Sequence, residues 1–195
     1  MPLVLASASP RRRDLLTTVG LAPLVRPVAL DESPQPGETA TAYVARLAHA
    51  KATAAHTAGD PPEVVLAADT TVALDGTILG KPADARQAHA MLTSLAGRRH
   101  AVHTAVTVTD GDRSDTVVVS ATVTFLPLTS AQIAGYVATG EPFDKAGGYG
   151  VQGAAGAFVE RVEGSYTTVV GLPVAETLAL LAAAGVTPRG TGRTG

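Results

Sequence analysis

Residues 63–82, EVVLAADTTVALDGTILGKP, contain the strongest structural signals in the chain. The run EVVLAAD is almost continuously apolar up to Asp69, which predicts a buried strand that ends at this aspartate. The residues that follow place the pair Asp75-Gly76 between two short β-like pieces, and this pair is typical of a hairpin turn. The stretch therefore predicts a buried strand followed by a hairpin.

Short apolar runs alternate with longer helical patterns on both sides of this stretch, which favours an α/β architecture over an all-helical or all-β one. The sequence before it predicts a strand at 3–6, a helix at 10–19, an extended piece at 23–30 and an Ala-rich helix at 39–58. The sequence after it predicts helices at 84–97, 129–140 and 172–185, strands at 100–110, 113–128 and 157–162, and an ordered loop at 141–156. The two long strands are expected to pair as an antiparallel hairpin around Gly111.

The composition is that of one globular domain. The chain has 195 residues and no repeat or linker that would divide it, so we expect one domain over 1–186 and a flexible tail over 187–195. Its formal net charge of -2 argues against a general nucleic-acid-binding protein. The chain has no cysteine, no signal-peptide pattern and no apolar run near the roughly 18 residues that span a bilayer. These features predict a cytoplasmic protein that binds no membrane.

Residues 5–16, LASASPRRRDLL, gather positive charge at the start of a predicted helix. Ser9 is a suitable N-cap and Pro10 suits the first helical position, so the free amide groups of the first turn can bind an anion. Arg11, Arg12 and Arg13 lie where the helix dipole is already positive, a small cost that a bound polyphosphate would offset. A capped surface helix with solvated arginines is the alternative interpretation of the same pattern.

Two acidic positions and the lysines of the chain suit a phosphate ligand. Asp69 at a strand end, beside the anion-binding helix, suggests Mg²⁺, which proteins hold with one or two carboxylates plus phosphate oxygens. Glu32 is a second candidate ligand, although Asp31 and Glu32 equally fit an ordinary turn pair. Lys51, Lys81 and Lys145 are individually typical of solvated side chains, but together with the arginines they can neutralise a triphosphate.

Other motifs do not support a site. GTILGKP (76–82) fails as a phosphate-binding P-loop because its glycine spacing is one residue short and Pro82 replaces the required Ser or Thr. GYGVQG (148–153) matches GxGxxG, but no buried strand precedes it, which excludes a Rossmann site. The five histidines show no spacing that brings metal ligands together.

Four stretches, in order, resemble the signature blocks of the Maf family of nucleoside triphosphate pyrophosphatases: LASASPRR (5–12), AADTTVALDGTILGKP (67–82), EPFDKAGGYGVQG (141–153) and EGSYTTVVGLP (163–173). The resemblance implies a fold like that of the inosine triphosphatase relatives, with two α/β lobes flanking a cleft on a long, mixed, twisted sheet. It also implies hydrolysis between the α and β phosphates, with release of a nucleoside monophosphate and pyrophosphate.

The resemblance also implies roles for individual residues. Ser9, Arg11 and Arg12 would hold the phosphates, and Lys51 and Lys81 would stabilise the leaving group. Glu32 and Asp69 would hold a divalent cation, Mg²⁺ or Mn²⁺, and Asp69 would accept the proton of the attacking water. These roles suit phosphoryl chemistry, in which a protein positions a water in line and supplies preorganised positive charge.

Base preference within the family is implied by three positions. Arg12, Thr70 and Gln152 match the subgroup similar to dTTP and UTP pyrophosphatases, whereas members that act on 7-methyl-GTP differ there. The amide of Gln152 can donate to and accept from the imide edge of uracil or thymine. One departure is Thr168, where family members often carry Asn, so the role of that side chain here is open. Modified pyrimidine nucleotides would use the same site in a house-cleaning activity.

The sequence offers two alternatives to an enzyme: a nucleotide sensor and a nucleic-acid-binding protein. A non-catalytic nucleotide sensor that regulates cell division would bind triphosphates without turnover, but Glu32, Lys51, Asp69 and Lys81 are all present and favour an enzyme. A nucleic-acid-binding protein built on the arginine cluster is disfavoured by the charge and by the few aromatic residues. The resemblance implies a possible homodimer.

Overall fold

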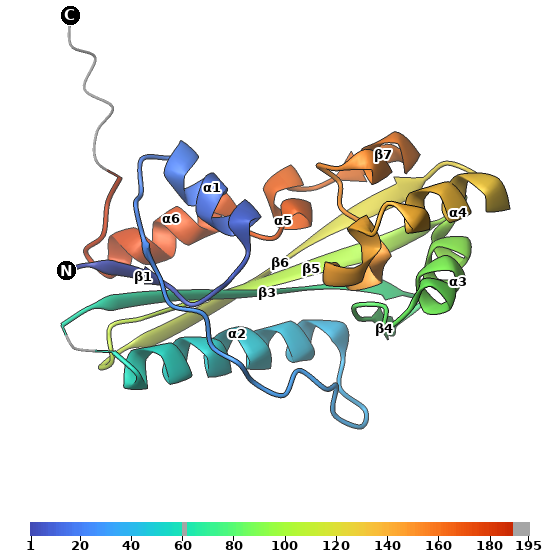
Figure 1. The fold of residues 1–195 in the computed structure, drawn as a ribbon. Helices are drawn as coiled ribbons and strands as arrows, with labels where there is room; N and C mark the ends of the chain where they lie inside the picture. The colour runs from blue at the N-terminus through green and yellow to red at the C-terminus, as the bar shows by residue number, and fades with distance from the viewer. Residues whose placement is uncertain (60–61, 189–195) are drawn as a thin grey trace, which may run out of the picture.

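A computed structural model describes residues 1–59 and 62–188 as a long mixed sheet flanked by helices (Figure 1). The seven strands run in the order β2-β1-β3-β5-β6-β7, and β4 pairs with β3 off this path. Strand β1 pairs in parallel with β2 and β3, whereas the other pairs are antiparallel. The strands are β1 (Leu3–Leu5), β2 (Leu24–Val25), β3 (Val64–Leu74), β4 (Thr77–Leu79), β5 (Arg99–Thr109), β6 (Ser114–Phe125) and β7 (Val159–Glu163).

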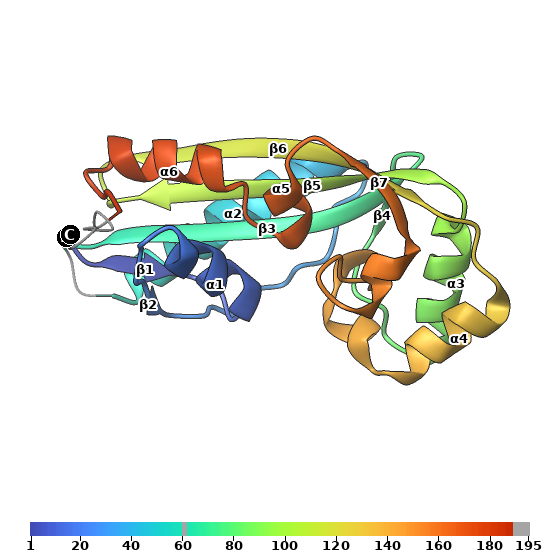
Figure 2. The same cartoon turned by 90° about the horizontal axis from the view of Figure 1, so that it is seen from above.

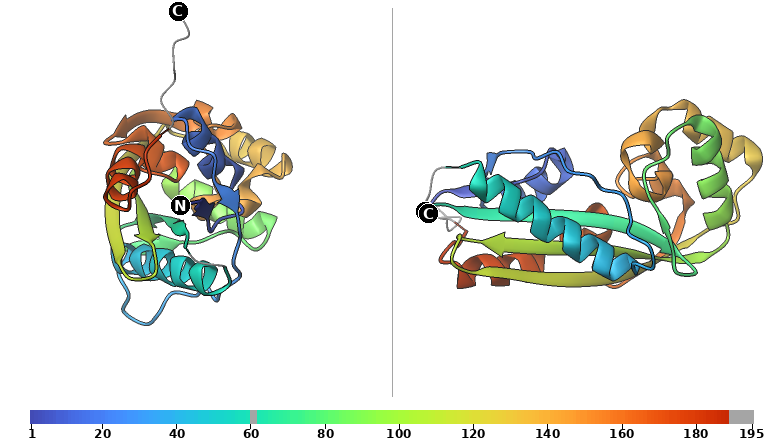
Figure 3. Two further views of the ribbon diagram at one scale, coloured as in Figure 1. Left: turned by 90° about the vertical axis from the view of Figure 1, so that its left-hand side faces the viewer. Right: turned by 90° about the horizontal axis from the view of Figure 1, so that it is seen from below.

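Helices cover both faces of the sheet and one of its ends. Helix α2 (Ala40–Thr57) lies on one face, and α1 (Pro10–Thr18), α5 (Tyr166–Val170) and α6 (Val174–Ala183) lie on the other (Figures 1 and 2). Helices α3 (Ala85–Leu95) and α4 (Ser130–Ala138) form a separate group at the far end of β3, β5 and β6 (Figure 3). The arrangement has two lobes that share the long strands.

The two lobes have separate hydrophobic cores. Val72 of β3 and Val102 of β5 belong to the core of the α3–α4 lobe. Leu66 of β3 and Val106 of β5 belong to the core that α1 and α6 cover. The long strands therefore cross from one core to the other, and the predicted two-lobed α/β fold with a long mixed sheet is confirmed.

The prediction that a strand ends at Asp69 is wrong. Strand β3 continues to Leu74, and it pairs with β5 in unbroken register from Val65 to Ala73. The polar residues 69–71 do not interrupt the strand, because successive side chains point to opposite faces and find polar partners there: Asp69 accepts a hydrogen bond from Lys51, and Thr70 accepts one from Arg12. Asp69 therefore projects from the middle of a strand.

The predicted hairpins β3–β4 and β5–β6 are confirmed, whereas the segments 141–158 and 166–170 differ from the prediction. Asp75 and Gly76 have φ values of 49° and 81°, as the turn between β3 and β4 requires. The predicted loop at 141–156 contains short 3-10 helices: η1 (Glu141–Asp144), η2 (Ala146–Gly148) and the start of η3 (Ala154–Phe158). Helix α5 was not predicted. The domain limits 1–186 stay a prediction, and residues 189–195 of the predicted tail lie outside the described residues.

Gly147 fixes the segment between Lys145 and Gln152 against strand β3. Its φ is +68°, and an added Cβ would lie 2.9 Å from Val72 Cγ2. We expect Gly147→Ala to lower the free energy of unfolding by about 1–3 kcal/mol through overpacking and backbone strain. Denaturant unfolding measures the change.

Gly135 provides the matched control for this substitution. It lies inside α4, and an added Cβ there would have no neighbour within 4 Å. Gly135→Ala is expected to raise the free energy of unfolding by about 0.5–1 kcal/mol, because alanine loses less entropy in a helix. Equal losses in the two variants would contradict the packing argument.

Candidate active site

A cleft of about 610 Å³ lies between the two lobes. Arg13 of the predicted arginine cluster does not line this cleft and instead pairs with Asp14. The other residues predicted to act in the site all line it: Ser9, Arg11, Arg12, Glu32, Lys51, Asp69, Thr70, Lys81, Lys145 and Gln152. The lining includes all three lysines of the chain. The structure thus brings together residues from widely separated parts of the sequence.

Helix α1 presents its amino end to the cleft. Ser9 is the N-cap and Pro10 is the first helical residue, but the Ser9 side chain makes no capping hydrogen bond. The Ser9 amide instead donates to Ser7 Oγ at 3.2 Å. The first turn of the helix therefore faces the cleft with its amide groups and with a hydroxyl that the cap does not use.

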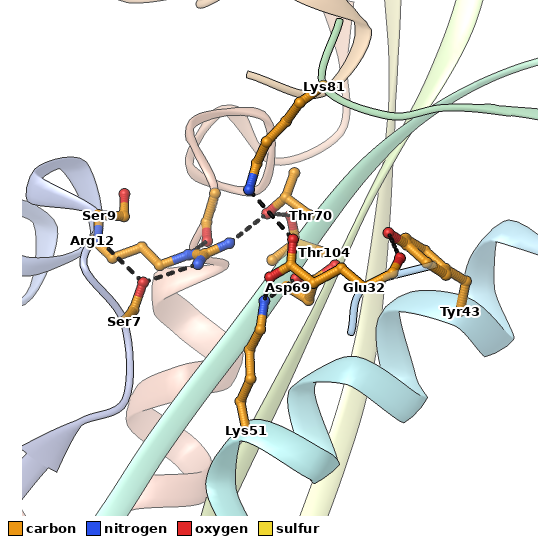
Figure 4. Close-up of polar contacts among 11 residues, drawn as sticks. Ser7, Ser9, Arg12, Glu32, Tyr43, Lys51, Asp69, Thr70, Lys81 and Thr104 are labelled. Atoms are coloured by element: carbon orange, nitrogen blue, oxygen red, sulfur yellow. Dashed lines mark hydrogen bonds and ion pairs between the residues drawn. The ribbon is translucent and has the colours of Figure 1, made fainter. Parts of the chain in front are cut away.

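Arg12 is the most firmly held cation in this group. Its Nε donates to the carbonyl oxygen of Gly171 at 2.8 Å, its Nη1 to Ser7 Oγ at 3.1 Å and its Nη2 to Thr70 Oγ1 at 3.0 Å (Figure 4). Burial lowers the pKa of Arg12, and the charge of Asp69 acts against this effect. Arg11 is looser, with Nη1 3.9 Å from the exposed Asp144 of the opposite lobe.

Lys51 lies between two carboxylates at the centre of the cleft. Its Nζ is 2.6 Å from Asp69 Oδ1 and 2.5 Å from Glu32 Oε1 (Figure 4). Lys81 Nζ contacts the other oxygen of Glu32 at 3.2 Å. Helix α2 supplies Lys51 and also Tyr43, whose hydroxyl donates to the backbone carbonyl of Glu32 at 2.8 Å. The loop that carries Glu32 is thus tied to α2.

Burial and charge act differently on the two carboxylates. Burial raises the pKa of Asp69, and the positive charge of Lys51 limits the rise. Burial acts in the same direction on Glu32, but the hydrogen bonds and charges of Lys51 and Lys81 outweigh it and lower the pKa. Asp69 is therefore the carboxylate that takes up a proton more readily. Burial near both carboxylates raises the pKa of Tyr43 to about 12, so its hydroxyl remains a donor.

The site fits a cation that a phosphate ligand helps to hold. Asp69 and Glu32 converge on one position, which the Lys51 ammonium occupies in the structure. Thr71, two residues along β3 on the face of Asp69, is 1% exposed, and its hydroxyl lacks a hydrogen-bond partner among the described residues. No group of three or more His, Cys, Asp or Glu side chains in that part of the chain is arranged to hold a metal alone. Two converging carboxylates suit Mg²⁺, which keeps waters and phosphate oxygens as its other ligands.

The opposite wall of the cleft carries Lys145 and Gln152. Lys145 Nζ donates to the backbone carbonyl of Glu141 at 2.8 Å and contacts Asp144 Oδ1 at 2.6 Å. The Glu141 carboxylate accepts from Tyr136 Oη at 3.0 Å and from the Ala154 amide at 3.1 Å, which ties down both ends of the segment. Gln152 is exposed at the cleft rim.

Several residues that organise the site were not predicted. Ser7 and Thr104 hold the Arg12 group, Tyr43 holds the Glu32 loop, and Asp144 pairs with cations of the cleft. Ser7 stands next to the anion-binding motif, which is a weak signal. Tyr43 follows the apolar spacing of α2, and Thr104 lies in an apolar strand, so pattern alone assigns both to the core.

The fold and the cleft define a two-lobed α/β protein whose central site combines a helix amino end with two carboxylates and three lysines. Residues 2–184 match the family model described as Maf-like protein, and the chain belongs to the Maf family. The resemblance given by the four sequence blocks is thereby confirmed. No helix within residues 1–59 and 62–188 is long and apolar enough to cross a membrane.

Curated relatives match nearly the whole chain. A dTTP/UTP pyrophosphatase from Anaeromyxobacter sp. (strain Fw109-5) is 55% identical over 188 residues, covering 94% of this chain and 89% of the relative. One from Myxococcus xanthus is 52% identical, covering 94% and 93%. A solved nucleoside-triphosphatase / dITP/XTP pyrophosphatase from Mycobacterium abscessus has a TM-score of 0.43 and 17% identity over 66% of this chain and 76% of that one. This structural likeness is too weak to carry an argument.

Proposed function

We propose that the protein hydrolyses dTTP and UTP to the nucleoside monophosphate and pyrophosphate. The observation that carries the proposal is that a helix amino end, all three lysines, the buried Asp69 and the half-exposed Glu32 line one cleft. Relatives at 52–55% identity that are named dTTP/UTP pyrophosphatase support the choice of substrate. The finer assignments, to modified pyrimidines and to a homodimer, rest on the family resemblance.

The triphosphate binds along the wall formed by α1 in this proposal. The first-turn amides and the Ser9 hydroxyl donate to phosphate oxygens, and Arg11 and Arg12 supply charge-assisted hydrogen bonds. Arg12 has five N–H donors, and the protein uses three of them, so donors remain for the substrate. Because Arg12 is already fixed, binding costs little side-chain entropy.

Asp69 is the proposed proton acceptor. A water attacks the α phosphorus, the bond from that phosphorus to the oxygen bridging to the β phosphate breaks, and the water proton passes to an Asp69 oxygen. Burial makes Asp69 a better base than an ordinary aspartate, because it raises the pKa of the carboxyl. Asp69 and Glu32 would hold a divalent cation, Mg²⁺ or Mn²⁺, which when bound neutralises phosphate charge and lowers the pKa of a bound water.

The lysines stabilise the pyrophosphate that leaves. Lys51 forms ion pairs with Glu32 and Asp69, and Lys81 forms one with Glu32. A bound triphosphate offers both ammonium groups new anionic partners. Lys145 adds positive charge from the opposite lobe. Preorganised positive charge of this kind acts where negative charge develops in the transition state.

The experiment that tests the proposal is initial-rate pyrophosphate release from a nucleotide panel. The panel contains dTTP, UTP, CTP, dATP, GTP and 7-methyl-GTP, each with Mg²⁺, with Mn²⁺ and with a chelator. We expect cation-dependent release concentrated on dTTP and UTP. Release from a purine nucleotide in preference to both would overturn the substrate assignment.

Gln152 gives a sharper prediction about the base. An amide can donate to one atom and accept from another along the imide edge of uracil or thymine, whereas a carboxylate can only accept. Gln152→Glu is therefore expected to lower kcat/KM for dTTP and UTP by about tenfold or more, with a smaller effect on the purine nucleotides. An equal loss on every nucleotide would indicate a structural role instead.

A further inference from the structure

Thr104 lies behind the cleft wall and is connected to Arg12 through Thr70. It is fully buried, and it stands directly opposite Thr70 in the register of β3 and β5. Thr70 Oγ1 and Thr104 Oγ1 are 2.9 Å apart (Figure 4). Thr104 Oγ1 donates to the backbone carbonyl of Thr168 at 2.8 Å. Thr104 itself is not part of the cleft lining.

The donor and the acceptor of each hydrogen bond from Arg12 through Thr70 and Thr104 to Thr168 can be assigned. The carbonyl of Thr168 can only accept, so Thr104 spends its one hydroxyl proton there. Thr70 must then donate to Thr104, and the oxygen of Thr70 accepts from Arg12 Nη2. The Arg12 guanidinium thus donates to the Thr70 hydroxyl, which donates to the Thr104 hydroxyl, which donates to the Thr168 carbonyl. Each donor in such a chain polarises the next, which strengthens the whole.

This series of hydrogen bonds connects Arg12 to α5 at two points. Thr168 belongs to this helix and Gly171 is its C-cap. The Gly171 carbonyl accepts directly from Arg12 Nε, and the Thr168 carbonyl accepts through the two threonines. The series of hydrogen bonds ends at the backbone carbonyl of Thr168, so it does not depend on whether the side chain at that position is Thr or Asn. Arg12 is therefore clamped from two sides.

We propose that Thr104 is a positioning residue that, through Thr70, holds Arg12 in its ligand-binding orientation. This proposal deepens the proposed function and rests on it for its kinetic readout. Without the Thr104 hydroxyl, the Thr70 proton loses its acceptor, and the Thr70 hydroxyl is free to rotate away from Arg12. Arg12 then keeps its bonds to Gly171 and Ser7 but loses the rigid third one.

Three variants test the proposal. Thr104→Val keeps the shape and removes the hydroxyl, and Thr104→Ser restores it. Thr107→Val is the matched control, because Thr107 is also fully buried on β5 and shares a hydroxyl pair with Thr116 at 2.8 Å, away from the cleft. If the loss of Thr104 acts only through general stability, Thr107→Val should reproduce its effects.

The first readout does not need catalysis. The Arg12 Nε–H resonance, assigned by its absence in Arg12→Lys, is followed by NMR for exchange with water. Because Nη2 makes the bond to Thr70, the Nη2–H resonances of Arg12, assigned in the same way, are followed beside Nε–H, whose bond to Gly171 is kept. We expect exchange of Nη2–H to be at least about tenfold faster in Thr104→Val and near the wild-type rate in Thr104→Ser and Thr107→Val. An unchanged rate in Thr104→Val overturns the proposal.

The second readout is the split between KM and kcat on dTTP. Weakened positioning of a binding group is expected to raise KM by about tenfold and to change kcat by less than about twofold. In a Thr70→Val background, Thr104→Val should add no more than about twofold, because the connection is already broken. Additive effects would overturn the proposal. If the wild type releases no pyrophosphate while the NMR result holds, Thr104 positions Arg12 and the proposed function is the part that fails.

Discussion

Replacing Asp69 with Asn is expected to lower kcat for pyrophosphate release from dTTP by about a thousandfold. The amide oxygen can still accept the hydrogen bond from Lys51, but it cannot take a proton from water and carries no charge for a cation. The measurement is steady-state pyrophosphate release at saturating dTTP and Mg²⁺. Near-normal turnover in this variant would remove Asp69 from the role of base.

The same substitution is not expected to destabilise the protein. Burial raises the pKa of Asp69 in the folded state, so the stability that this group contributes is present at low pH and is lost as the pH rises through the folded-state pKa. At neutral pH the neutral Asn avoids that loss, and thermal unfolding should show a Tm no lower than wild type. Asp75→Asn, an exposed turn position at φ 49° that suits Asn, is the control for a lost charge and should remain fully active.

Replacing Lys51 with Met is expected to lower kcat/KM for dTTP by about a hundredfold and to move the acid limb of the pH profile upward. Lys51 opposes the effect of burial on Asp69. Without it the pKa of Asp69 rises further, so the base becomes protonated at higher pH than in the wild type. A profile of kcat/KM from pH 5 to 9 measures the shift.

Lys81→Met separates this electrostatic effect from a general loss of positive charge. In the part of the chain that the structure describes, Lys81 pairs with Glu32 and not with Asp69. It should lower kcat/KM while leaving the acid limb nearer its wild-type position. If the acid limb of the kcat/KM profile lay at its wild-type pH in both lysine variants, Asp69 would not be the group whose protonation sets that limb.

The fold was predictable from sequence where pattern and packing agree. The hairpins at Asp75-Gly76 and Gly111 follow from turn chemistry, and the capping box at Thr129 marks the start of α4. Helix α5 was missed because YTTVV is rich in β-branched residues, which favour strands. Its helical form depends on the Ser165 cap and on packing against β5, which a local pattern does not record.

The site was predictable in composition and not in arrangement. The signature blocks contain most of the predicted residues that line the cleft, although Glu32 and Lys51 lie outside them. Asp69 was expected at a strand end because the apolar run stops there. In the structure Asp69 and Thr70 point to opposite faces of one strand, where Asp69 contacts Lys51 of α2 and Thr70 contacts Arg12 of α1. The hydrogen bonds of Thr104 to Thr70 and Thr168 could not be predicted from the sequence, because threonine is common in strands and its partners are distant along the chain.

The central claim is cleavage between the α and β phosphates, and ³¹P NMR of dTTP hydrolysis in ¹⁸O-labelled water tests it most directly. We predict dTMP and pyrophosphate in equal amounts, with the ¹⁸O label in dTMP. Formation of dTDP and inorganic phosphate would contradict the account. So would tight binding of dTTP in the presence of Mg²⁺ and Mn²⁺ without any product, which would identify the protein as a nucleotide sensor.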